Sequence, residues 1–246
     1  MNRPPIPPMF IADAPGLDFL NSIATPVDVE IDWLDSGEGL LTWLERASLV
    51  PRPVLDTFHA SALPGELDAV AAQARSLREW FRQFVRRHKG RPLTPKALVE
   101  IEPLRRLLEQ DDAFAEIVVH GHGEGAVFEL QAQRRWRSAE ALLLPIADTL
   151  AKLICGEDFS QVKACEGLQC TMLFADHTRG HSRRWCSMAL CGNRAKVAAH
   201  RKRRKQMLHE APLNAQPGAH LKSQPETRLQ LHAQAQAQTQ TQQKAP

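Results

Sequence analysis

The chain has 246 residues, 43% of them hydrophobic, so it can bury one large core or two small ones. Its formal net charge of +3 is unevenly spread: residues 1–176 hold 18 basic and 26 acidic residues, whereas residues 177–209 hold ten basic residues and no acidic one. No run reaches the roughly 18 apolar residues of a membrane helix, and the proline-rich start lacks a signal peptide's apolar stretch, so we expect a cytoplasmic protein with no membrane partner.

The first part of the chain predicts an extended arm followed by helices. Residues 1–15 are rich in proline, and the apolar pattern begins with "GLDFLNSIA" at residues 16–24. Leucines at three- and four-residue steps predict a helix over about 38–48. The longest helical pattern covers residues 64–90, where Pro64 can open the helix and Gly90 can close it.

The central part of the chain changes its period. Residues 94–111 predict a helix with Thr94 as N-cap. Two β-prone runs around a glycine-rich centre predict a hairpin over 115–132. Residues 138–156 predict a helix that is kinked or restarted at Pro145. The fold class is therefore mainly α (α+β), with a multihelical domain that contains a small β-hairpin.

Four segments follow from these patterns. An N-terminal arm over 1–15 precedes a helical domain over 16–160, which we expect to fold without the rest. A cysteine-rich and basic region covers 161–208. Residues 209–246 are rich in Gln, Ala, Pro and Thr, and such a composition predicts a disordered tail.

Four cysteines form two pairs with a repeated spacing, C-x4-C-x15-C-x4-C. Zinc takes four thiolates at the corners of a tetrahedron, and two close pairs can supply them. The flanks "KACEGLQCTM" and "RRWCSMALCGNR" are too polar for four buried thiols unrelated to a metal. The predicted zinc ligands are Cys165, Cys170, Cys186 and Cys191.

The other candidate ligands are less suitable. Cys155 ends an apolar helix, and we expect a small buried thiol there. His177 and His181 lie between the pairs, but four cysteines already fill the tetrahedron. A filled tetrahedron leaves no open position for substrate or water, and no G-x-S-x-G, H-E-x-x-H or phosphate-loop pattern is present. We therefore expect no enzymatic activity.

A basic segment follows the last cysteine directly. Asn193 is the predicted N-cap of a helix whose start the zinc would fix, with Gly192 allowing a sharp turn. We expect small residues, Ala195 and Val197 to Ala199, to pack inward on this helix. A metal-anchored cluster of cations favours binding to nucleic acid. The candidate contacts are Arg183, Arg184, Arg194, Lys196, Arg201, Lys202, Arg203, Arg204 and Lys205.

Two further roles for the basic segment stay open. The same finger could bind RNA, or it could dock a protein without any catalysis. RNA modules usually stack bases on exposed aromatic side chains. The basic helix has no aromatic residue, so duplex DNA is favoured.

Residues 165–205 resemble the CGNR zinc finger, named for the tetrapeptide found here as Cys191-Gly192-Asn193-Arg194. The likeness also covers both x4 pairs and "LFADHT". "GLDFLNSIA", "DWL" and "LLTWLERASLV" resemble the start of the ABATE domain, which precedes this finger. The resemblance implies a bacterial transcription regulator, in some members related to stress. The helical domain would then sense a small-molecule effector or form a homodimer, and the finger would bind DNA.

The same resemblance implies supporting roles. Phe174 and Trp185 are expected to pack around the metal knuckle. Asp176 is expected to hydrogen-bond to the finger backbone or to its arginines. Asp18 and Asn21 are expected to cap a helix end.

Overall fold

The computed structural model describes residues 6–25 and 29–210. It divides into two compact units, residues 1–202 and 203–246. In the second unit only residues 203–210 are described, as the end of helix α8. Most of the predicted tail, and residues 1–5 of the predicted arm, lie outside the described residues. Among the residues described, no helix is both long and apolar enough to span a membrane.

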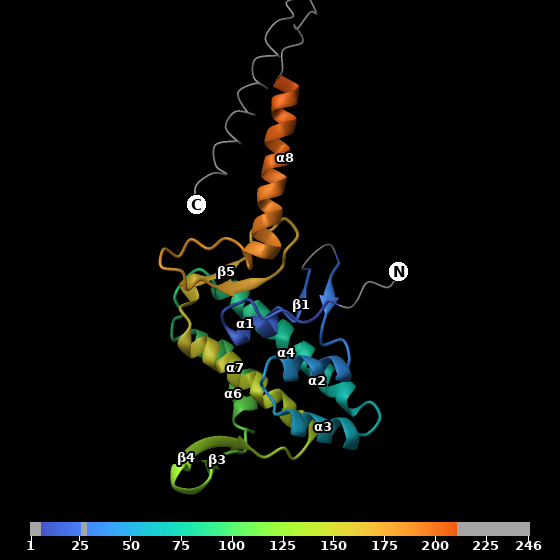
Figure 1. Cartoon of the computed structure of the whole chain (residues 1–246), viewed down its shortest axis with the longest axis vertical. Helices are drawn as coiled ribbons and strands as arrows, with labels where there is room; N and C mark the ends of the chain where they lie inside the picture. The colour runs from blue at the N-terminus through green and yellow to red at the C-terminus, as the bar shows by residue number, and fades with distance from the viewer. Residues whose placement is uncertain (1–5, 26–28, 211–246) are drawn as a thin grey trace, which may run out of the picture. The chain divides into compact units, whose positions relative to one another are not determined.

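The fold is mainly helical with small antiparallel hairpins, as predicted (Figure 1). The helices are α1 (Pro15–Leu20), α2 (Gly37–Arg46), α3 (Arg52–Ser61), α4 (Glu66–His88), α5 (Ala97–Glu100), α6 (Glu102–Leu108), α7 (Leu143–Gly156) and α8 (Asn193–Glu210). The strands are β1 (Ile23–Ala24), β2 (Ile31–Asp32), β3 (Ala113–His120), β4 (Val127–Arg134), β5 (Val162–Ala164) and β6 (Leu173–Ala175). They pair as β1–β2, β3–β4 and β5–β6.

The short helix α1 lies at the centre of the core. It packs against α7, α4 and β6, and its residues from Gly16 to Leu20 are all buried. A Cβ atom at Gly16 would lie 2.9 Å from both Leu153 Cβ and the Thr149 carbonyl oxygen. A glycine is therefore required where α1 crosses α7, and this close approach buries the hydrophobic side chains of "GLDFL".

The long helix α4 carries two buried arginines that anchor it to the N-terminal strands. Arg78 forms a bidentate ion pair with Asp32, at 2.7 Å for each bond, and donates to the Ser22 hydroxyl at 3.0 Å. Arg82 donates to the Leu20 carbonyl at the end of α1. Since both guanidinium groups are buried, these partners provide the compensation that a buried charge requires.

The helix predicted over 94–111 is broken into α5 and α6. Ile101, between them, leaves the helical conformation with φ −96° and ψ 12°. Pro103 explains the break, because its nitrogen has no N–H to donate to the turn before it, whereas proline is tolerated in the first turn of a new helix. Pro145 instead lies in the first turn of α7, where a 3-10 turn over Ala139–Leu142 ends and the helix restarts.

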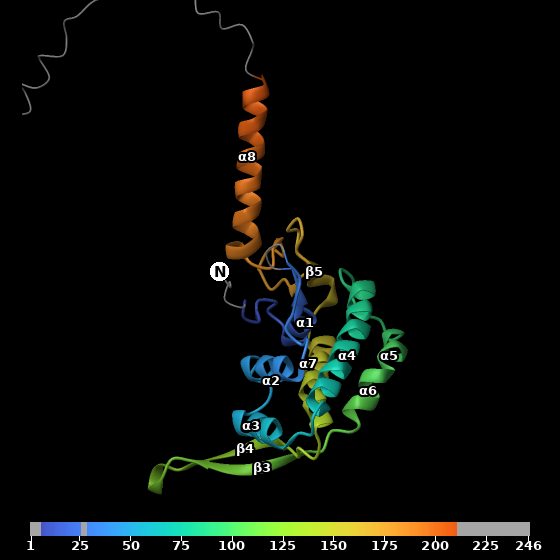
Figure 2. The same ribbon diagram turned by 90° about the vertical axis from the view of Figure 1, so that its right-hand side faces the viewer.

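The predicted β-hairpin forms, with boundaries two residues wider on each side. β3 and β4 pair along eight residues each, from Ala113↔Arg134 to His120↔Val127. Figures 1 and 2 both show this hairpin extending away from the helices of its unit. Almost all of its residues are exposed.

The cysteine-rich region shares one hydrophobic core with the helices. Phe174 and Met172 belong to the same buried cluster as Leu17 and Leu150, and so do three of the four paired cysteines. Residues 161–202 fall in the same compact unit as the helical region. The finger and the helices therefore form one compact unit, and the independent folding of residues 16–160 stays a prediction.

Candidate metal centre

The four paired cysteines meet at one point. Their Sγ atoms all lie within 4.8 Å of one another. Cys186 Sγ lies 3.8 Å from Cys170 Sγ and 3.7 Å from Cys191 Sγ. A tetrahedral zinc with Zn–S bonds near 2.3 Å separates its sulfurs by about 3.8 Å. All four thiols are free, and this spacing fits a shared metal ion.

Local structure places each pair. Cys165 follows β5 and Cys170 precedes β6, so the first pair lies in the turn of the β5–β6 hairpin. The Cys165 N–H donates to the Met172 carbonyl at 2.9 Å, which extends the pairing of the two strands into this turn. Cys186 precedes a π-helical turn over Met188–Gly192 that contains Cys191. Ser187 caps this turn by accepting a hydrogen bond from the Ala189 N–H at 3.2 Å.

Two glycines make room for the cluster. A Cβ at Gly167 would lie 2.9 Å from Cys191 Sγ and 3.0 Å from Cys170 Cβ. A Cβ at Gly192 would lie 2.6 Å from Met188 Sδ. The expected sharp turn at Gly192 is absent, because this residue lies within a continuous helical path; the glycine is needed for its small size rather than for a left-handed conformation.

Hydrogen-bond donors point at the sulfurs. The Cys186 N–H donates to Cys165 Sγ at 3.2 Å, and the Gly167 N–H donates to the same sulfur at 3.4 Å. Arg194 Nη2 donates to Cys191 Sγ at 3.4 Å. Bonds of this kind favour the thiolate over the thiol, which is the form that a metal binds.

The pKa values of the clustered cysteines show that four thiolates need a cation beside them. A hydrogen bond from Cys186 lowers the pKa of Cys170 to about 5. Donating that hydrogen bond raises the pKa of Cys186, and burial raises it further. For Cys191, burial and the negative charge of Cys170 raise the pKa to about 11. Without an ion, Cys186 and Cys191 therefore favour the thiol near neutral pH. A dication compensates the repulsion among four thiolates, so the donor set fits zinc.

The other candidate ligands lie elsewhere. His177 Nε2 lies 2.7 Å from Glu157 Oε2, and this partner raises the pKa of the imidazole. His181 Nδ1 lies 3.0 Å from the Asp176 carbonyl oxygen. Cys155 is exposed, so the expectation of a buried thiol there is wrong. The side chain faces outward because only one face of α7 packs into the core.

Asp176 accepts hydrogen bonds from the backbone of the finger, as expected. Its fully buried carboxylate accepts hydrogen bonds from the Arg183 N–H at 2.9 Å and from the Thr178 N–H and hydroxyl at 3.0 and 2.6 Å. The Lys163 ammonium lies 2.7 Å away. Burial raises the pKa of Asp176, but these donors outweigh burial and hold its pKa below the usual value. Sequence reasoning missed Lys163, because its ion pair with Asp176 depends on the β5–β6 register, which places Lys163 opposite Phe174.

Arg183 belongs to the interior of the finger. Its guanidinium stacks 4.3 Å above the buried Phe174 ring and pairs with Asp13. It also donates to backbone carbonyls of residues 11, 175, 185 and 186. With its donors occupied in this way, it is a structural clamp between the N-terminal segment and the second cysteine pair.

Arg184 is more accessible than Arg183. Its side chain is 60% exposed, pairs with Glu166 at 2.6 Å, and lies 5.0 Å from the half-buried Trp185 ring. Trp185 packs against the core cluster beside the knuckle, as expected.

Asp18 and Asn21 do not act as the expected side-chain caps. Asp18 lies inside the first turn of α1 and accepts from the Ile11 and Ala12 N–H groups, at 2.9 and 3.0 Å. Asn21 ends α1, but its side chain bridges the N–H and carbonyl of Leu173 in β6, at 2.9 and 2.8 Å. The two residues therefore connect α1 to its neighbours in space, which the sequence pattern could not reveal.

Helix α8 starts differently from the prediction. Asn193 has helical dihedrals, φ −66° and ψ −39°, so it is not an N-cap; Ser187 begins the helical path instead. Val197, Ala198 and Ala199 are exposed rather than packed inward. Arg194 stays at the cluster, where its Nε donates to the Leu190 carbonyl at 3.0 Å.

Six further cations extend along α8. All six are exposed, and none forms an ion pair with another residue in the described part of the chain. They are Lys196, Arg201, Lys202, Arg203, Arg204 and Lys205.

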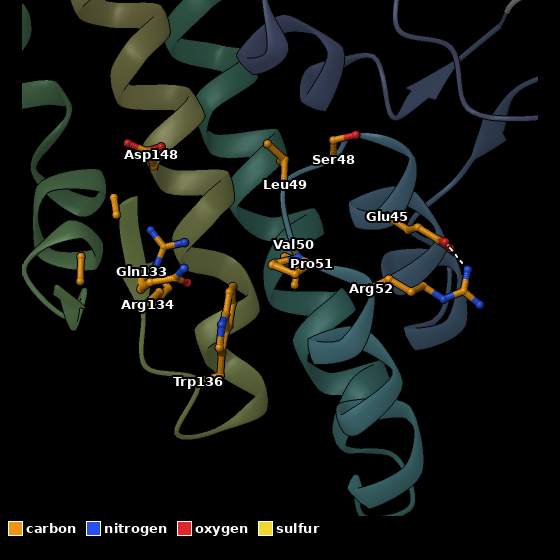
Figure 3. A pocket seen from close by; sticks show the side chains of 12 residues that line it. Glu45, Ser48, Leu49, Val50, Pro51, Arg52, Gln133, Arg134, Trp136 and Asp148 are labelled. Carbon is orange, nitrogen blue, oxygen red and sulfur yellow. Dashed lines mark hydrogen bonds and ion pairs between the residues drawn. The ribbon is translucent and has the colours of Figure 1, made fainter. Parts of the chain in front are cut away.

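A separate pocket of about 560 Å³ lies where the β3–β4 hairpin joins the helices. Figure 3 shows the side chains of Arg134 and Trp136 facing Val50 and Pro51 across it. Its charged groups already have protein partners: Arg134 binds Asp111 at 2.6 and 2.7 Å, and Arg52 pairs with Glu45. The pocket therefore presents no unpartnered charge that would define a ligand.

Two family models match the sequence. The ABATE family, described as "Putative stress-induced transcription regulator", matches residues 13–157. The CGNR zinc finger matches residues 161–204. No curated protein matches the chain. The first match alone spans more than half of the sequence, and neither description names an enzymatic activity.

Proposed function

Because this chain belongs to the ABATE family and carries a CGNR zinc finger, we propose that it is a zinc-dependent transcription regulator that binds DNA through the finger. Cys165, Cys170, Cys186 and Cys191 hold the zinc, and α8 is the DNA-binding element. The helical region acts as the sensing or dimerising part.

One observation carries this proposal: a helix bearing six exposed cations begins directly at the cysteine cluster. The major groove of B-DNA admits an α-helix and has phosphates on both walls. Steps of 100° place Lys202 and Arg204 on opposite flanks of α8, so cations can reach both walls together. The zinc would hold the first turn of this helix through Cys191.

We propose a smaller set of DNA contacts than the one expected from the sequence. Arg183 is left out because its donors are bound inside the finger. Arg194 acts as a positioning residue, because it donates to Cys191 Sγ. Arg184 is also left out of the proposed contacts, because it is paired with Glu166. The proposed phosphate contacts are the six cations of α8.

The decisive experiment is a salt titration of binding to duplex DNA by the zinc-loaded protein. If about four or five phosphates are contacted at once, log affinity should fall with log salt with a slope of about −4. Metal-free protein serves as the control and should bind more weakly. A flat salt dependence, or no binding at low salt, would reject the role in DNA binding and favour the finger as a protein-docking module.

A further inference from the structure

The β3–β4 hairpin has one face that is apolar from residue 115 to residue 132, with Arg134 at its base. The cross-strand pairs Ile117↔Leu130 and Val119↔Phe128 lie side by side on it, and Ala115↔Ala132 extends it. Ile117, Leu130 and Phe128 are 69, 70 and 72% exposed, and Val119 is 53% exposed. Large hydrophobic side chains are seldom exposed together in this way on a protein that has no partner.

The opposite face of the hairpin carries most of its polar side chains, among them Glu116, Glu129 and Gln131, beside Phe114, Val118 and Val127. His120 Nε2 lies 2.9 Å from Glu129 Oε2, and Gln131 Nε2 donates to the same carboxylate at 3.2 Å. Alternation of this kind is typical of a sheet with one side in water and the other side against a core. The sequence of the hairpin is therefore suited to a covered apolar face.

No described part of the chain covers that face. The principal contacts of β3 and β4 are with each other, and the hairpin stands away from the helices of its unit (Figure 2). An isolated two-stranded hairpin is at best marginally stable in water. A surface from outside the described fold would remove the exposed hydrophobic area and stabilise the strands.

We propose that this face packs against the same face of a second copy of the chain, forming a homodimer. The inference deepens the proposed function, since it assigns the dimerising role to a defined surface. The exposed fractions of the four large side chains correspond to on the order of 500 Å² per hairpin, and two copies together reach the roughly 1,000 Å² that a specific interface needs. Packing face to face also leaves both polar faces in water.

Charge supports this choice of partner. The apolar face carries no ionisable side chain between residues 115 and 132, so it offers nothing to a nucleic acid or to a charged peptide. Pairing through the open strand edges alone would leave the apolar face exposed, so the faces themselves must meet.

The test is the mass of the full-length zinc-loaded protein in solution, by sedimentation or light scattering without DNA. The wild type should have twice the 27.5 kDa of one chain at micromolar concentration. Phe128→Glu should shift the protein to the mass of one chain. Glu129→Gln, the matched change on the polar face, should remain dimeric. Helical circular dichroism and zinc content should be the same in all three proteins.

Leu130→Gln provides a second, milder variant and should raise the dimer dissociation constant at least tenfold. A monomeric wild type would overturn the proposal, and so would a dimer that survives both Phe128→Glu and Leu130→Gln. Neither result bears on DNA binding, because a monomer can still show the salt-dependent affinity of α8. Loss of that affinity in a protein that remains dimeric would reject the DNA-binding role alone.

Discussion

Arg183 and Arg203 show how position decides the role of one side chain. Arg183 stacks on Phe174 and donates to four backbone carbonyls, so its charge serves to hold the finger together. Arg203 is exposed on α8 and can meet a polyanion. Both residues belong to the basic segment of the sequence. Only their surroundings distinguish the structural role of Arg183 from the proposed DNA-binding role of Arg203.

Replacement of one cluster cysteine tests the metal assignment. Cys186→Ser should lose most of the zinc, because a hydroxyl is a poor substitute for one of four thiolates. Metal analysis of the purified protein should give about one zinc per chain for the wild type and well below that for the variant. Cys155→Ser is the control, since Cys155 is exposed and lies outside the cluster. Full zinc content in Cys186→Ser would contradict the assignment.

Asp18 provides a pH-dependent prediction. Burial raises its pKa from 3.8 to about 6, despite hydrogen bonds from the Ala12 and Ile11 N–H groups. The folded state therefore holds a proton more tightly than the unfolded state, and this group's contribution to stability declines as pH rises from about 4 to 6. Asp18→Asn keeps an acceptor and removes this loss.

The free energy of unfolding by urea should therefore favour Asp18→Asn over the wild type increasingly as pH rises from 4 to 6, reaching about 1–3 kcal/mol, and the difference should then level off at higher pH. Glu109→Gln, a change at an exposed carboxylate, should show no such trend. A difference between Asp18→Asn and wild type that does not vary with pH would contradict the argument.

At the scale of elements, α8 and the β3–β4 hairpin share one property: neither packs on the core. Residues 196–206 of α8 are exposed on every side, and almost all of the hairpin is exposed as well. Elements like these normally gain stability from packing. Both are therefore expected to gain order from partners, DNA for α8 and a second copy for the hairpin.

A single substitution in α8 tests the first of these roles. Arg203→Ala should weaken binding to all duplex sequences about equally and reduce the salt slope by about one unit, because one phosphate contact is lost. Gln206→Ala, at an exposed uncharged position on the same helix, should leave the slope unchanged. An unaltered slope in Arg203→Ala would remove this residue from the interface.

At the scale of the whole molecule, the zinc finger and the helices form one core. Asn21 at the end of α1 binds Leu173 of β6, and Phe174 is buried in the same cluster as the helical side chains. Two of the cysteines lie in the hairpin turn that ends at β6. Loss of the metal should therefore weaken packing around α1 and not only the finger.

Chelation tests this coupling. A zinc chelator should lower the midpoint of thermal unfolding, followed by helical circular dichroism, by several degrees, since about 1 kcal/mol shifts the midpoint by 2–4 °C in a protein of this size. Cys186→Ser should melt at the lowered temperature without chelator, and chelator should then have no further effect. A helical transition that is unchanged by chelator would show that the helices fold independently of the finger.

The sequence alone determined the features that depend on spacing along the chain. The repeated x4 interval predicted which cysteines meet, and period and turn residues predicted the long helix at 66–88 and the hairpin at 113–134. Composition located the basic segment. These features are local, because each rests on residues that are neighbours in sequence or on one repeated pattern.

Only the tertiary structure decided which side chains were already bound. The roles of Arg183, Asp18 and Asn21 depend on partners up to 172 residues away, and the burial of the finger depends on α1. The exposure of Cys155 and of the apolar hairpin face likewise depends on what lies opposite them. Periodicity shows which residues share a face, but solvation and pairing are set by the chain that packs against it.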